Sequence, residues 1–460
     1  MRILLVVYDN GSHIHWFPQG LAYIAAALRG AGHEVHVFSQ DIDHAPPESL
    51  TARLDECHYD AVGVSACGGY WQYRQLLAIA TAVRAARERV PLVLGGHGPA
   101  ADPAYFLSVT DADAVVVGEG EDTAVHLFPA LGDSARLATV RGAVWRDGER
   151  VIENPRRQVR ADVDSLPLPA FDLFDVRHYR LLRFPRCEPT DFAMPVLSSR
   201  GCPFRCTFCF RLDPGYRARS PESIVAELRQ LQAQYGITYF AFSDELLMQS
   251  EARAFALCEA FRSSGLRFRW CCNGRLNYAT PEVLIEMHEA GCVFINYGIE
   301  ALDDEVLRLM EKHLTVAEIE AGIWHTLEAG ISPGLNVIWG NLGDTRETLR
   351  RGVEFLLTYD DGAQLRTIRP VTPYPGSRLY DLAIERGLLR DCADFYARHL
   401  NSDLCTVNFT EESDADFHRL LLDANTRLIR NYYRRQCTRT LISAEHLYAG
   451  DASFRGFRTT

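Results

Sequence analysis

The chain has 460 residues, of which 47% are hydrophobic and 23% charged, the composition of an ordinary globular protein with sizeable cores. This length predicts two or three domains. A net charge of −12 without any basic run argues against binding to nucleic acid or an anionic membrane. No apolar run reaches the roughly 18 residues that span a bilayer. We therefore expect a cytoplasmic protein with reduced thiols, acting on a small molecule or a peptide.

Near-continuous apolar strands alternate with helices in the first 130 residues. The strands are expected at residues 2–8, 33–39, 61–66, 91–96 and 113–121, with helices at 20–29, 47–56 and 70–88 between them. Such strands are typical of a parallel sheet covered by helices on both faces. The pattern predicts an α/β, doubly wound, flavodoxin-like (Rossmann-type) domain over residues 1–135.

Small residues and glycines follow the strands of this domain. Ligands in doubly wound sheets bind beyond the carboxyl ends of the strands, and glycine lets backbone approach a ligand closely. A large flat ligand at this edge is one interpretation, and tight strand-to-helix turns are the other; spacing alone does not choose between them. The strand-end segments are Asn10-Gly11, Ser65-Ala66-Cys67-Gly68-Gly69, Gly95-Gly96-His97-Gly98 and Gly118-Glu119-Gly120-Glu121.

A second strand–helix alternation follows a less regular stretch. Residues 136–190 contain an expected hairpin turning at Asp147-Gly148 and a proline-rich linker. Residues 191–388 then hold six expected strands, which suits a partial (β/α)6 TIM-like barrel with its chemistry at the carboxyl ends of the strands. Ser220-Pro221-Glu222 should open the helix after the first of them. Residues 389–460 are expected to form a mainly helical cap, with an amphipathic helix over 414–435. The six strands are expected at 195–199, 238–243, 268–273, 293–300, 335–340 and 365–371.

Three cysteines after the first barrel strand carry the strongest signal. Cys202, Cys206 and Cys209 are spaced C-x3-C-x2-C, so they can ligate three irons of one [4Fe-4S] cluster and leave the fourth iron open for chemistry. A zinc site would require a fourth ligand, and no further cysteine or histidine lies nearby in the sequence. Each of the other ten cysteines is expected to be a small buried hydrophobe: Cys57, Cys67, Cys187, Cys258, Cys271, Cys272, Cys292, Cys392, Cys405 and Cys437.

The cysteine triplet, with Phe208 before its last member, resembles the signature of radical S-adenosylmethionine (SAM) enzymes. Further resemblances follow at barrel spacing: Phe242-Ser243-Asp244-Glu245, Asn273-Gly274-Arg275, Tyr297-Gly298-Ile299-Glu300, Asn336-Val337-Ile338-Trp339-Gly340 and Pro373-Tyr374-Pro375-Gly376-Ser377. The resemblance implies polar groups for the SAM amino group after the second strand and a ribose-binding acid at Glu300. A glycine is usual where Asn336 stands. The SAM-binding residues implied are Phe208, Ser243, Asp244, Glu245, Asn273, Arg275, Glu300, Asn336 and Tyr374.

The first domain resembles the cobalamin-binding module that precedes many radical SAM barrels. The matching segments are Pro18-Gln19-Gly20-Leu21, the turn at Ser65, Leu94-Gly95-Gly96-His97 and Val117-Gly118-Glu119-Gly120-Glu121. By this likeness the turns at Ser65 and Gly95-Gly96 hold the nucleotide tail of cobalamin. The cobalamin-binding residues implied are Asn10, Gly11, Gln19, Ser65, Ala66, Cys67, Gly95, Gly96, His97, Gly118, Glu119 and Gly120.

One departure concerns the lower face of cobalt. Modules that ligate cobalt from below carry D-x-H-x-x-G after the first strand, but here Gly11 stands in the histidine position, and His13 and His15 are out of register. We therefore expect histidine-off cobalamin. A domain that keeps this fold without binding cobalamin is the alternative. His97, flanked by glycines, is expected to be a structural or solvent-exposed residue rather than a metal ligand.

Together the two resemblances imply an enzyme that methylates an unactivated carbon, or a phosphorus, of a small molecule. One SAM would methylate cobalamin, and another would yield the 5′-deoxyadenosyl radical, with electrons from a donor such as flavodoxin or ferredoxin. Ring contraction or oxidative cyclisation without methyl transfer is the alternative. A methylthiotransferase is disfavoured because the first domain lacks a second cysteine triplet, and a cobalamin sensor because the barrel triplet is intact. The sequence identifies no general acid or base and no substrate.

Overall fold

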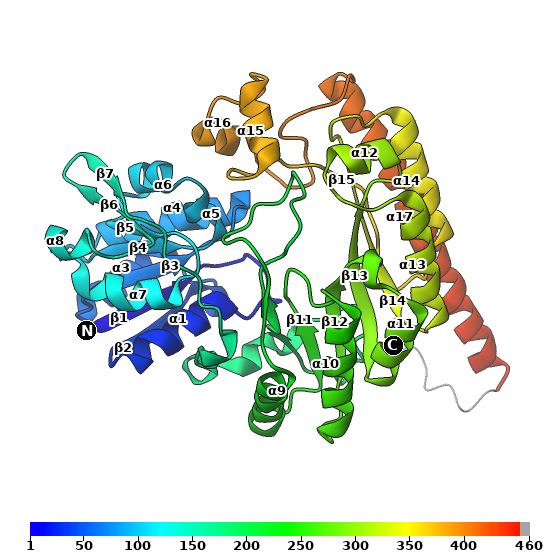
Figure 1. Cartoon of the computed structure of the whole chain (residues 1–460), viewed down its shortest axis with the longest axis horizontal. Coiled ribbons are helices and arrows are strands. Elements are labelled where there is room, and N and C mark those ends of the chain that lie inside the picture. Colours follow the sequence, from blue (N-terminus) through cyan, green and yellow to red (C-terminus); the bar gives the residue numbers. More distant parts are fainter. Residues whose placement is uncertain (451–460) are drawn as a thin grey trace.

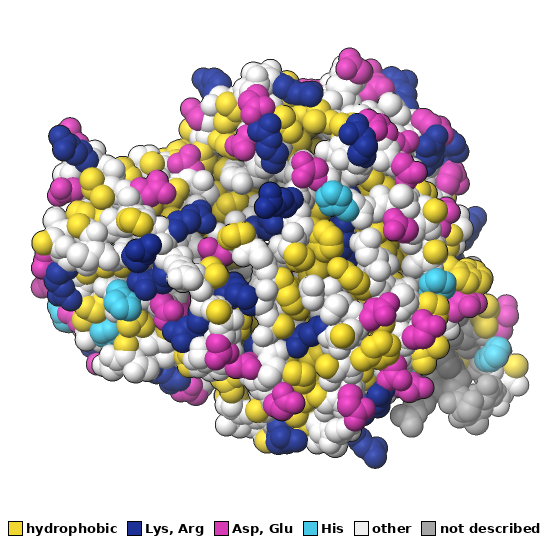
Figure 2. Space-filling view, viewed as in Figure 1, with side chains coloured by type: hydrophobic (Ala, Val, Ile, Leu, Met, Phe, Trp, Pro, Cys, Tyr) yellow, Lys and Arg dark blue, Asp and Glu magenta, His cyan; other side chains and the backbone are white. Residues whose placement is uncertain are grey.

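Two α/β units lie side by side in the computed structural model, which describes residues 1–450 (Figure 1). The first unit holds a seven-stranded sheet and the second a six-stranded parallel sheet. Arginine and acidic side chains are interspersed over the face shown in Figure 2, without one charge sign dominating it. Within residues 1–450, the search for helices that combine the length and apolarity of a membrane span found none.

The first sheet is parallel through its first five strands, in the order β2-β1-β3-β4-β5. Its central strands are covered on both faces, so that Ile3, Leu4, Leu5 and Val6 of β1 are at most 1% exposed. The predicted strands and the flavodoxin-like arrangement are confirmed. The strands are β1 (Arg2–Val7), β2 (Glu34–Ser39), β3 (Ala61–Ser65), β4 (Leu92–Gly95) and β5 (Ala114–Val116).

The expected hairpin forms but belongs to the first sheet. Strands β6 (Ala143–Asp147) and β7 (Arg150–Glu153) add to the sheet edge in antiparallel orientation, β6 pairing with β5. Trp145 of β6 is 2% exposed, and burying it against this unit explains why the hairpin is part of the sheet rather than of the linker. The first sheet therefore includes residues up to Glu153.

Helices cover both faces of the first sheet (Figure 1). Helix α4 ends at Arg84, four residues before the predicted end. Short 3-10 turns follow at Phe128–Ala130, Val163–Ser165, Phe171–Leu173 and Val176–Leu181. The helices are α1 (Gln19–Gly30), α2 (Gln40–Asp43), α3 (Pro47–Glu56), α4 (Tyr70–Arg84), α5 (His97–Ala101), α6 (Pro103–Thr110), α7 (Glu121–Leu127) and α8 (Ser134–Leu137).

The second sheet has the order β15-β14-β13-β12-β11-β8, with every neighbouring pair parallel. The partial barrel is confirmed, and each of the six predicted strands overlaps an observed one, although the first and last share only two residues with the predicted ranges 195–199 and 365–371. A two-stranded ribbon of β9 (Ser199–Arg200) and β10 (Arg217–Ala218) flanks the cysteine loop. The strands are β8 (Ala193–Val196), β11 (Tyr239–Phe242), β12 (Arg269–Gly274), β13 (Cys292–Glu300), β14 (Ser332–Trp339) and β15 (Arg369–Pro370).

Side chains of these strands alternate between the helical layer and the barrel interior. Phe242 and Trp270 point outward into the main core. Ala241 and Cys271 point inward, where Phe184 of the linker packs against them. The linker thus closes the base of the barrel, and the inward positions near the carboxyl ends of the strands are left for polar residues.

Capping side chains fix the starts of several helices. Ser220 accepts a hydrogen bond from the Ser223 amide, which confirms the predicted start of α9, and Thr315 with Glu318 forms a capping box at α13. The helices of this part of the chain are α9 (Pro221–Tyr235), α10 (Glu251–Ser263), α11 (Pro281–Glu289), α12 (Asp304–Leu309), α13 (Val316–Glu328), α14 (Arg346–Thr358), α15 (Arg378–Glu385), α16 (Cys392–Arg398) and α17 (Asp414–Tyr448), with a 3-10 turn at Leu276–Tyr278.

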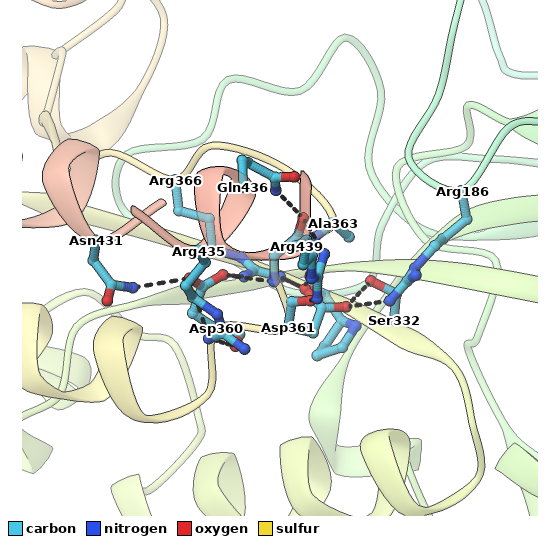
Figure 3. A network of polar contacts seen from close by, with 12 residues as sticks. Arg186, Ser332, Asp360, Asp361, Ala363, Arg366, Asn431, Arg435, Gln436 and Arg439 are labelled. Carbon is cyan, nitrogen blue, oxygen red and sulfur yellow. Dashed lines mark hydrogen bonds and ion pairs between the residues drawn. The ribbon is translucent and has the colours of Figure 1, made fainter. Parts of the chain in front are cut away.

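The long helix α17 lies along α14 on the outside of the barrel (Figure 1), not across its mouth as the predicted cap would. Its inner side is apolar only at Phe417, Leu421, Ala424 and Leu428, which pack into the barrel core. Beyond these residues it is held by a polar clamp, defined as Asp360, Asp361 and Arg366 together with Asn431, Arg435, Gln436 and Arg439 (Figure 3).

Helix α16 instead covers part of the first unit. The ring of Tyr396 stacks on Tyr73 of α4 with 4.0 Å between ring centroids, and its hydroxyl donates to the carbonyl of Gly68 at 3.3 Å. These contacts place α16 at the junction of the two units.

Candidate active site at the junction of the two units

A cavity of about 330 Å³ lies between the strand ends of the two units. Seven of the twelve predicted cobalamin-binding residues line it, whereas Asn10, Gly11, Gln19, Ala66 and Cys67 do not. The opposite wall comes from the second unit, including Ser199, Arg200, Asp213, Arg217, Ser243, Asp244 and Glu245. The seven lining residues from the first unit are Ser65, Gly95, Gly96, His97, Gly118, Glu119 and Gly120.

Glycines at these strand ends keep the cavity open. A Cβ added to Gly95 would touch only Val116, at 3.9 Å, so the missing side chain leaves room in the cavity wall. Gly96 has a φ of +89°, and a Cβ there would collide with the backbone of Ala66. Both readings of the glycine pattern therefore hold at once: Gly96 makes a tight turn, and Gly95 makes space for a ligand.

Ion pairs join the two units at the rim of this cavity. Arg217 pairs with Glu119, and Arg200 pairs with Glu121 at 2.5 Å. The backbone N–H of Glu119 donates to Asp213 at 2.9 Å, and burial raises the pKa of that carboxyl. The Glu119 carboxylate is thus held by arginine, and Gly118, Glu119 and Gly120 line the cavity beside this ion pair.

The cysteine loop lies between β8 and α9 and is braced by its own backbone and by the barrel. Cys209 N donates to Cys206 O at 3.1 Å, and Thr207 N donates to Met310 O at 3.0 Å. Burial raises the pKa of Cys209 to about 12, and the neighbouring Cys206 adds to the rise. A second cavity, of about 340 Å³, opens onto Cys206 and Cys209 and is also lined by Arg205, Arg211 and Arg378.

The two acids after β11 differ in their surroundings. Asp244 is 1% exposed and accepts hydrogen bonds from the Ser198 and Ser199 amides at 2.6 and 3.1 Å, and from the Ser198 hydroxyl. Burial raises the pKa of Asp244. Glu245 is exposed to the cavity, where Arg211 counteracts the rise in its pKa that partial burial causes. Of the pair, Glu245 is therefore the acid with a carboxylate free to meet a ligand.

Three asparagines form an amide ladder across the barrel interior. Asn336 Nδ2 donates to Asn296 Oδ1 at 2.7 Å, Asn296 Nδ2 to Asn273 Oδ1 at 3.0 Å, and Asn273 Nδ2 to Asp244 O at 2.7 Å. Ser243 next to it donates to Gln19 Oε1 of the first unit at 2.7 Å. Asn296 was missed by sequence reasoning, although it lies two residues before Gly298 and therefore shares its face of β13.

Glu300 ends β13 in an irregular conformation. A register shift separates Gly298 from Glu300, whose φ is +71°, and Lys312 Nζ lies 3.0 Å from its Oε1 atom. Such a bulge re-aims the side chains at a strand end. Lys312 was not predicted from the sequence. It is the one lysine of the chain, and this is the signal that could have identified it.

The remaining predicted SAM residues lie around the cysteine loop. Phe208 is half-buried and contacts both large cores. The guanidinium of Arg275 lies 3.5 Å from the centroid of the Phe204 ring, so Arg275 packs against the cysteine loop at Phe204. Tyr374 lies farther off, against Phe395 and His399, where burial raises its pKa.

The histidines of the first unit are mostly engaged with acids away from the cavity. His15 Nδ1 lies 2.8 Å from Asp41, which also accepts from Asn10 N at 2.7 Å. His13 contacts His44 at 3.2 Å, and His44 contacts Asp9 at 2.9 Å. His97 lines the cavity, and burial lowers its pKa, which favours a neutral ring there.

The thirteen cysteines are all free thiols. Five of the ten outside the triplet are buried as predicted, and three are half-buried. The prediction is wrong for Cys67 and Cys437, which are exposed: Cys67 is in the loop after β3, and Cys437 is on α17 beyond the part that packs against the barrel. The five buried ones are Cys258, Cys271, Cys272, Cys292 and Cys392.

Comparison with known proteins agrees with this arrangement. The model of the radical SAM superfamily matches residues 196–356, and that of the B12 binding domain matches residues 12–128. The chain is 30% identical over 405 residues to the uncharacterized methyltransferase PH0819 of Pyrococcus horikoshii, covering 85% of this chain and 84% of the relative. This chain therefore belongs to the radical SAM superfamily and is a cobalamin-dependent, methyltransferase-like enzyme within it.

Two further proteins, one compared by sequence and one by structure, are similar to this chain. The anaerobic magnesium-protoporphyrin IX monomethyl ester cyclase of Cereibacter sphaeroides is 28% identical over 400 residues, which are 83% of this chain and 63% of the cyclase. The methyltransferase TsrM from Kitasatospora setae, solved with cobalamin and a [4Fe-4S] cluster, shares the fold with a TM-score of 0.67. Its sequence identity is 21%, and the match covers 84% of this chain and 75% of TsrM.

The residues of the chain fit the cofactors of this family. The cavity at the strand ends of the first unit has an open glycine wall, and its volume lies at the lower end of the range of small-molecule pockets. The cysteine loop offers three thiols and a cavity beside two of them. Within residues 1–450 there is no group of three His, Cys, Asp or Glu side chains that could hold a single metal ion.

Proposed function

We propose that this chain methylates an unactivated carbon, or a phosphorus, of a small-molecule substrate. The observation that supports it is the shared cavity, because strand ends of the cobalamin-binding unit and the Ser243–Glu245 end of β11 line the same space. Two reacting groups held in one enclosed space gain most of their rate from orientation. The cofactors, when bound, supply reductive cleavage of SAM and a carrier for its methyl group.

The chain's own residues have the tasks of binding and placement. Cys202, Cys206 and Cys209 would hold the [4Fe-4S] cluster, with a flavodoxin or ferredoxin as electron donor. Glu245 and Glu300 supply acceptors for the amino group and ribose of SAM. The Gly95-Gly96 turn and the Gly118–Gly120 backbone would hold cobalamin, whose lower face we propose to be free of histidine, since His13 and His15 are engaged with His44 and Asp41. The predicted SAM contacts Phe208, Ser243, Asp244, Asn273, Arg275, Asn336 and Tyr374 stay part of this proposal, Asp244 and Arg275 as supporting residues.

Cofactor content is the first test. After anaerobic reconstitution with iron, sulfide and hydroxocobalamin, the wild type should contain about four irons and one cobalt per chain. The triple variant Cys202→Ala, Cys206→Ala, Cys209→Ala should lose the iron and keep the cobalt. As a matched control, Cys258→Ala, Cys392→Ala, Cys437→Ala should keep both. Iron in the first variant at the wild-type level would contradict the cluster assignment.

Oxidative cyclisation without methyl transfer is the second candidate, supported by the 28% identity to the cyclase. SAM with a deuterated methyl group separates the two without knowledge of the substrate. Label recovered in the corrinoid fraction after an acid quench supports methyl transfer. Conversion of SAM to 5′-deoxyadenosine with no label in that fraction favours cyclisation.

A further inference from the structure

The chain uses arginine for its positive charges with one exception. Of its 48 lysine and arginine residues, one is a lysine, Lys312. This residue is 6% exposed, in the segment that follows α12. Lysine is mostly found in solvent, and it is rarely buried unless paired. The chain otherwise uses arginine, and its one lysine lies in the interior. This indicates a local requirement for the ammonium group of Lys312.

Lys312 connects the predicted ribose acid with the cysteine loop. Its Nζ atom lies 3.0 Å from Glu300 Oε1 and 5.9 Å from the centroid of the Phe208 ring, the residue before Cys209. Glu300 is itself 8% exposed. Among the described residues no hydrogen bond is made to its second oxygen, Oε2, which leaves that atom available to accept from a ligand hydroxyl.

The backbone on both sides of this ion pair is irregular. Glu300 has a φ of +71°, and Glu311 and His313, which flank Lys312, have φ values of +53° and +52°. Side chains other than glycine rarely adopt this conformation, and clusters of it are found at functional sites where surrounding contacts hold it in place. Here the Glu300–Lys312 ion pair is the contact that joins the two irregular segments.

The space around the pair explains why the cation is lysine. A Cβ placed on Gly298 would overlap Glu300 Oε1 and would lie 3.0 Å from Lys312 Nζ. The side-chain position of Gly298 is therefore filled by the pair itself. A compact ammonium fits in such a space, whereas the planar guanidinium of arginine is wider and needs a matching fork of acceptors.

The segment that carries Lys312 also supports the cysteine loop. Thr207 N donates to Met310 O at 3.0 Å. Arg275, which lies on the Phe204 ring, donates to His313 O at 3.4 Å. Residues 310–313 thus contact the cysteine loop at Thr207 and Phe208 directly and at Phe204 through Arg275.

We propose that Lys312 is a positioning residue for SAM. It holds one oxygen of Glu300, so that the other is aimed at the ribose hydroxyls, and it fixes this acid relative to the loop that carries the cluster. The inference rests on the proposed function, in which Glu300 meets the SAM ribose. It goes further in assigning a separate task to a residue that need not touch SAM.

The test compares Lys312→Arg and Lys312→Met with the wild type and with Arg308→Lys, a control on the exposed face of α12. Binding of radiolabelled SAM to the reconstituted enzyme is measured by equilibrium dialysis, and the EPR spectrum of the reduced cluster is recorded with and without SAM. Both Lys312 variants should bind SAM at least about tenfold more weakly, a loss of 1.4 kcal/mol or more, with cobalamin binding retained. The control should match the wild type.

Wild-type affinity for SAM in Lys312→Arg would overturn the inference, because charge alone would then suffice. If Glu300→Gln binds SAM as the wild type does, the role of Glu300 in the proposed function fails and the inference fails with it. If Lys312→Arg binds normally but Glu300→Gln does not, the proposed function stands and the inference alone is wrong.

A measurement on the wild type covers the case in which the variants do not fold. Acetic anhydride can modify one ε-amine in this chain, and mass spectrometry follows it at Lys312. SAM at ten times its Kd should slow this modification about tenfold, because the reagent reaches Lys312 only when the buried pair opens, and bound SAM holds the pair closed. Equal rates with and without SAM would overturn the inference.

Discussion

The buried carboxyl of Asp344 in the second unit holds a turn together, a task that its position in the sequence does not reveal. Asp344 is 6% exposed, in the turn after β14, and accepts hydrogen bonds from Gly340 N, Asn341 N and the Thr348 hydroxyl at 2.9, 2.9 and 2.7 Å. Burial is the largest influence on it and raises its pKa to about 6. The folded protein therefore binds a proton at Asp344 more tightly than the unfolded chain does.

This pKa predicts a pH dependence of stability. Since the folded-state pKa is the higher one, the stabilisation is complete below pH 4 and is lost as the pH rises through about 6. Between pH 4 and 7 the loss should be about 2 kcal/mol, and Asp344→Asn should remove it. Urea denaturation of the apoprotein at several pH values measures the difference between the two proteins. A difference that stays constant with pH would contradict the prediction.

The two neighbouring acids after β11 show how far sequence reasoning reaches at this scale. The spacing behind the cysteine triplet predicts polar groups at this strand end, and the structure has Ser243, Asp244 and Glu245 there. Which acid turns into the protein was not predictable, because it depends on the Ser198 and Ser199 amides of another strand end. Lys312 was missed for a similar reason: its partner Glu300 is brought to it by the bulge in β13.

At the scale of elements, the alternation of apolar strands and helices was sufficient to predict both sheets. It was not sufficient for the hairpin β6–β7 or for α17. A short hairpin looks the same in sequence whether it stands alone or extends a sheet, and α17 has an apolar stripe only in its first half. The second half is held by the polar clamp of Figure 3, whose partners are about 70 residues away in the sequence.

The polar clamp should be the stabilising contact of α17. Arg366 is 7% exposed and pairs with Asp360 and Asp361 at 2.8 and 2.9 Å. Without Arg366, Asp360 keeps Arg435 and Asn431 as partners and Asp361 keeps Arg186, so Arg366→Met should cost about 1.5–3 kcal/mol of unfolding free energy, the range for lost hydrogen bonds to charged groups. Arg350→Met, which breaks an exposed pair with Glu347 on α14, should cost less than about 1 kcal/mol. Denaturant unfolding compares the two variants, and equal losses would show that the clamp is not stabilising.

For the molecule as a whole, the relation between the two units was beyond sequence reasoning. The contacts that set it join distant residues, such as Gln19 with Ser243 and Glu119 with Arg217, and no local pattern announces them. The sequence predicted the two binding edges separately, by glycines in one unit and by cysteines in the other. That both line one cavity follows only from the structure.

The ion pairs at the junction should therefore control cobalamin binding. Arg217→Met removes the partner that holds Glu119, and with it the position of the Gly118–Gly120 backbone in the cavity wall. We expect the Kd for hydroxocobalamin to rise about tenfold, which corresponds to 1.4 kcal/mol, while the iron content stays unchanged. Equilibrium dialysis measures the affinity, with Arg177→Met on the surface as control. An unchanged Kd would show that the junction does not shape the site.

The stacking of Tyr396 on the first unit has a consequence for biosynthesis. Tyr73 and Tyr105 belong to helices made early, whereas the ring that covers them is made about 290 to 320 residues later. At common elongation rates this interval lasts roughly 15 to 60 s. Once β7 has been made, the nascent first unit has a complete sheet but still lacks its late cover beside the Gly68 loop. The loop at Gly68 therefore receives its contact from α16 only late in synthesis, after the sheet of the first unit is complete.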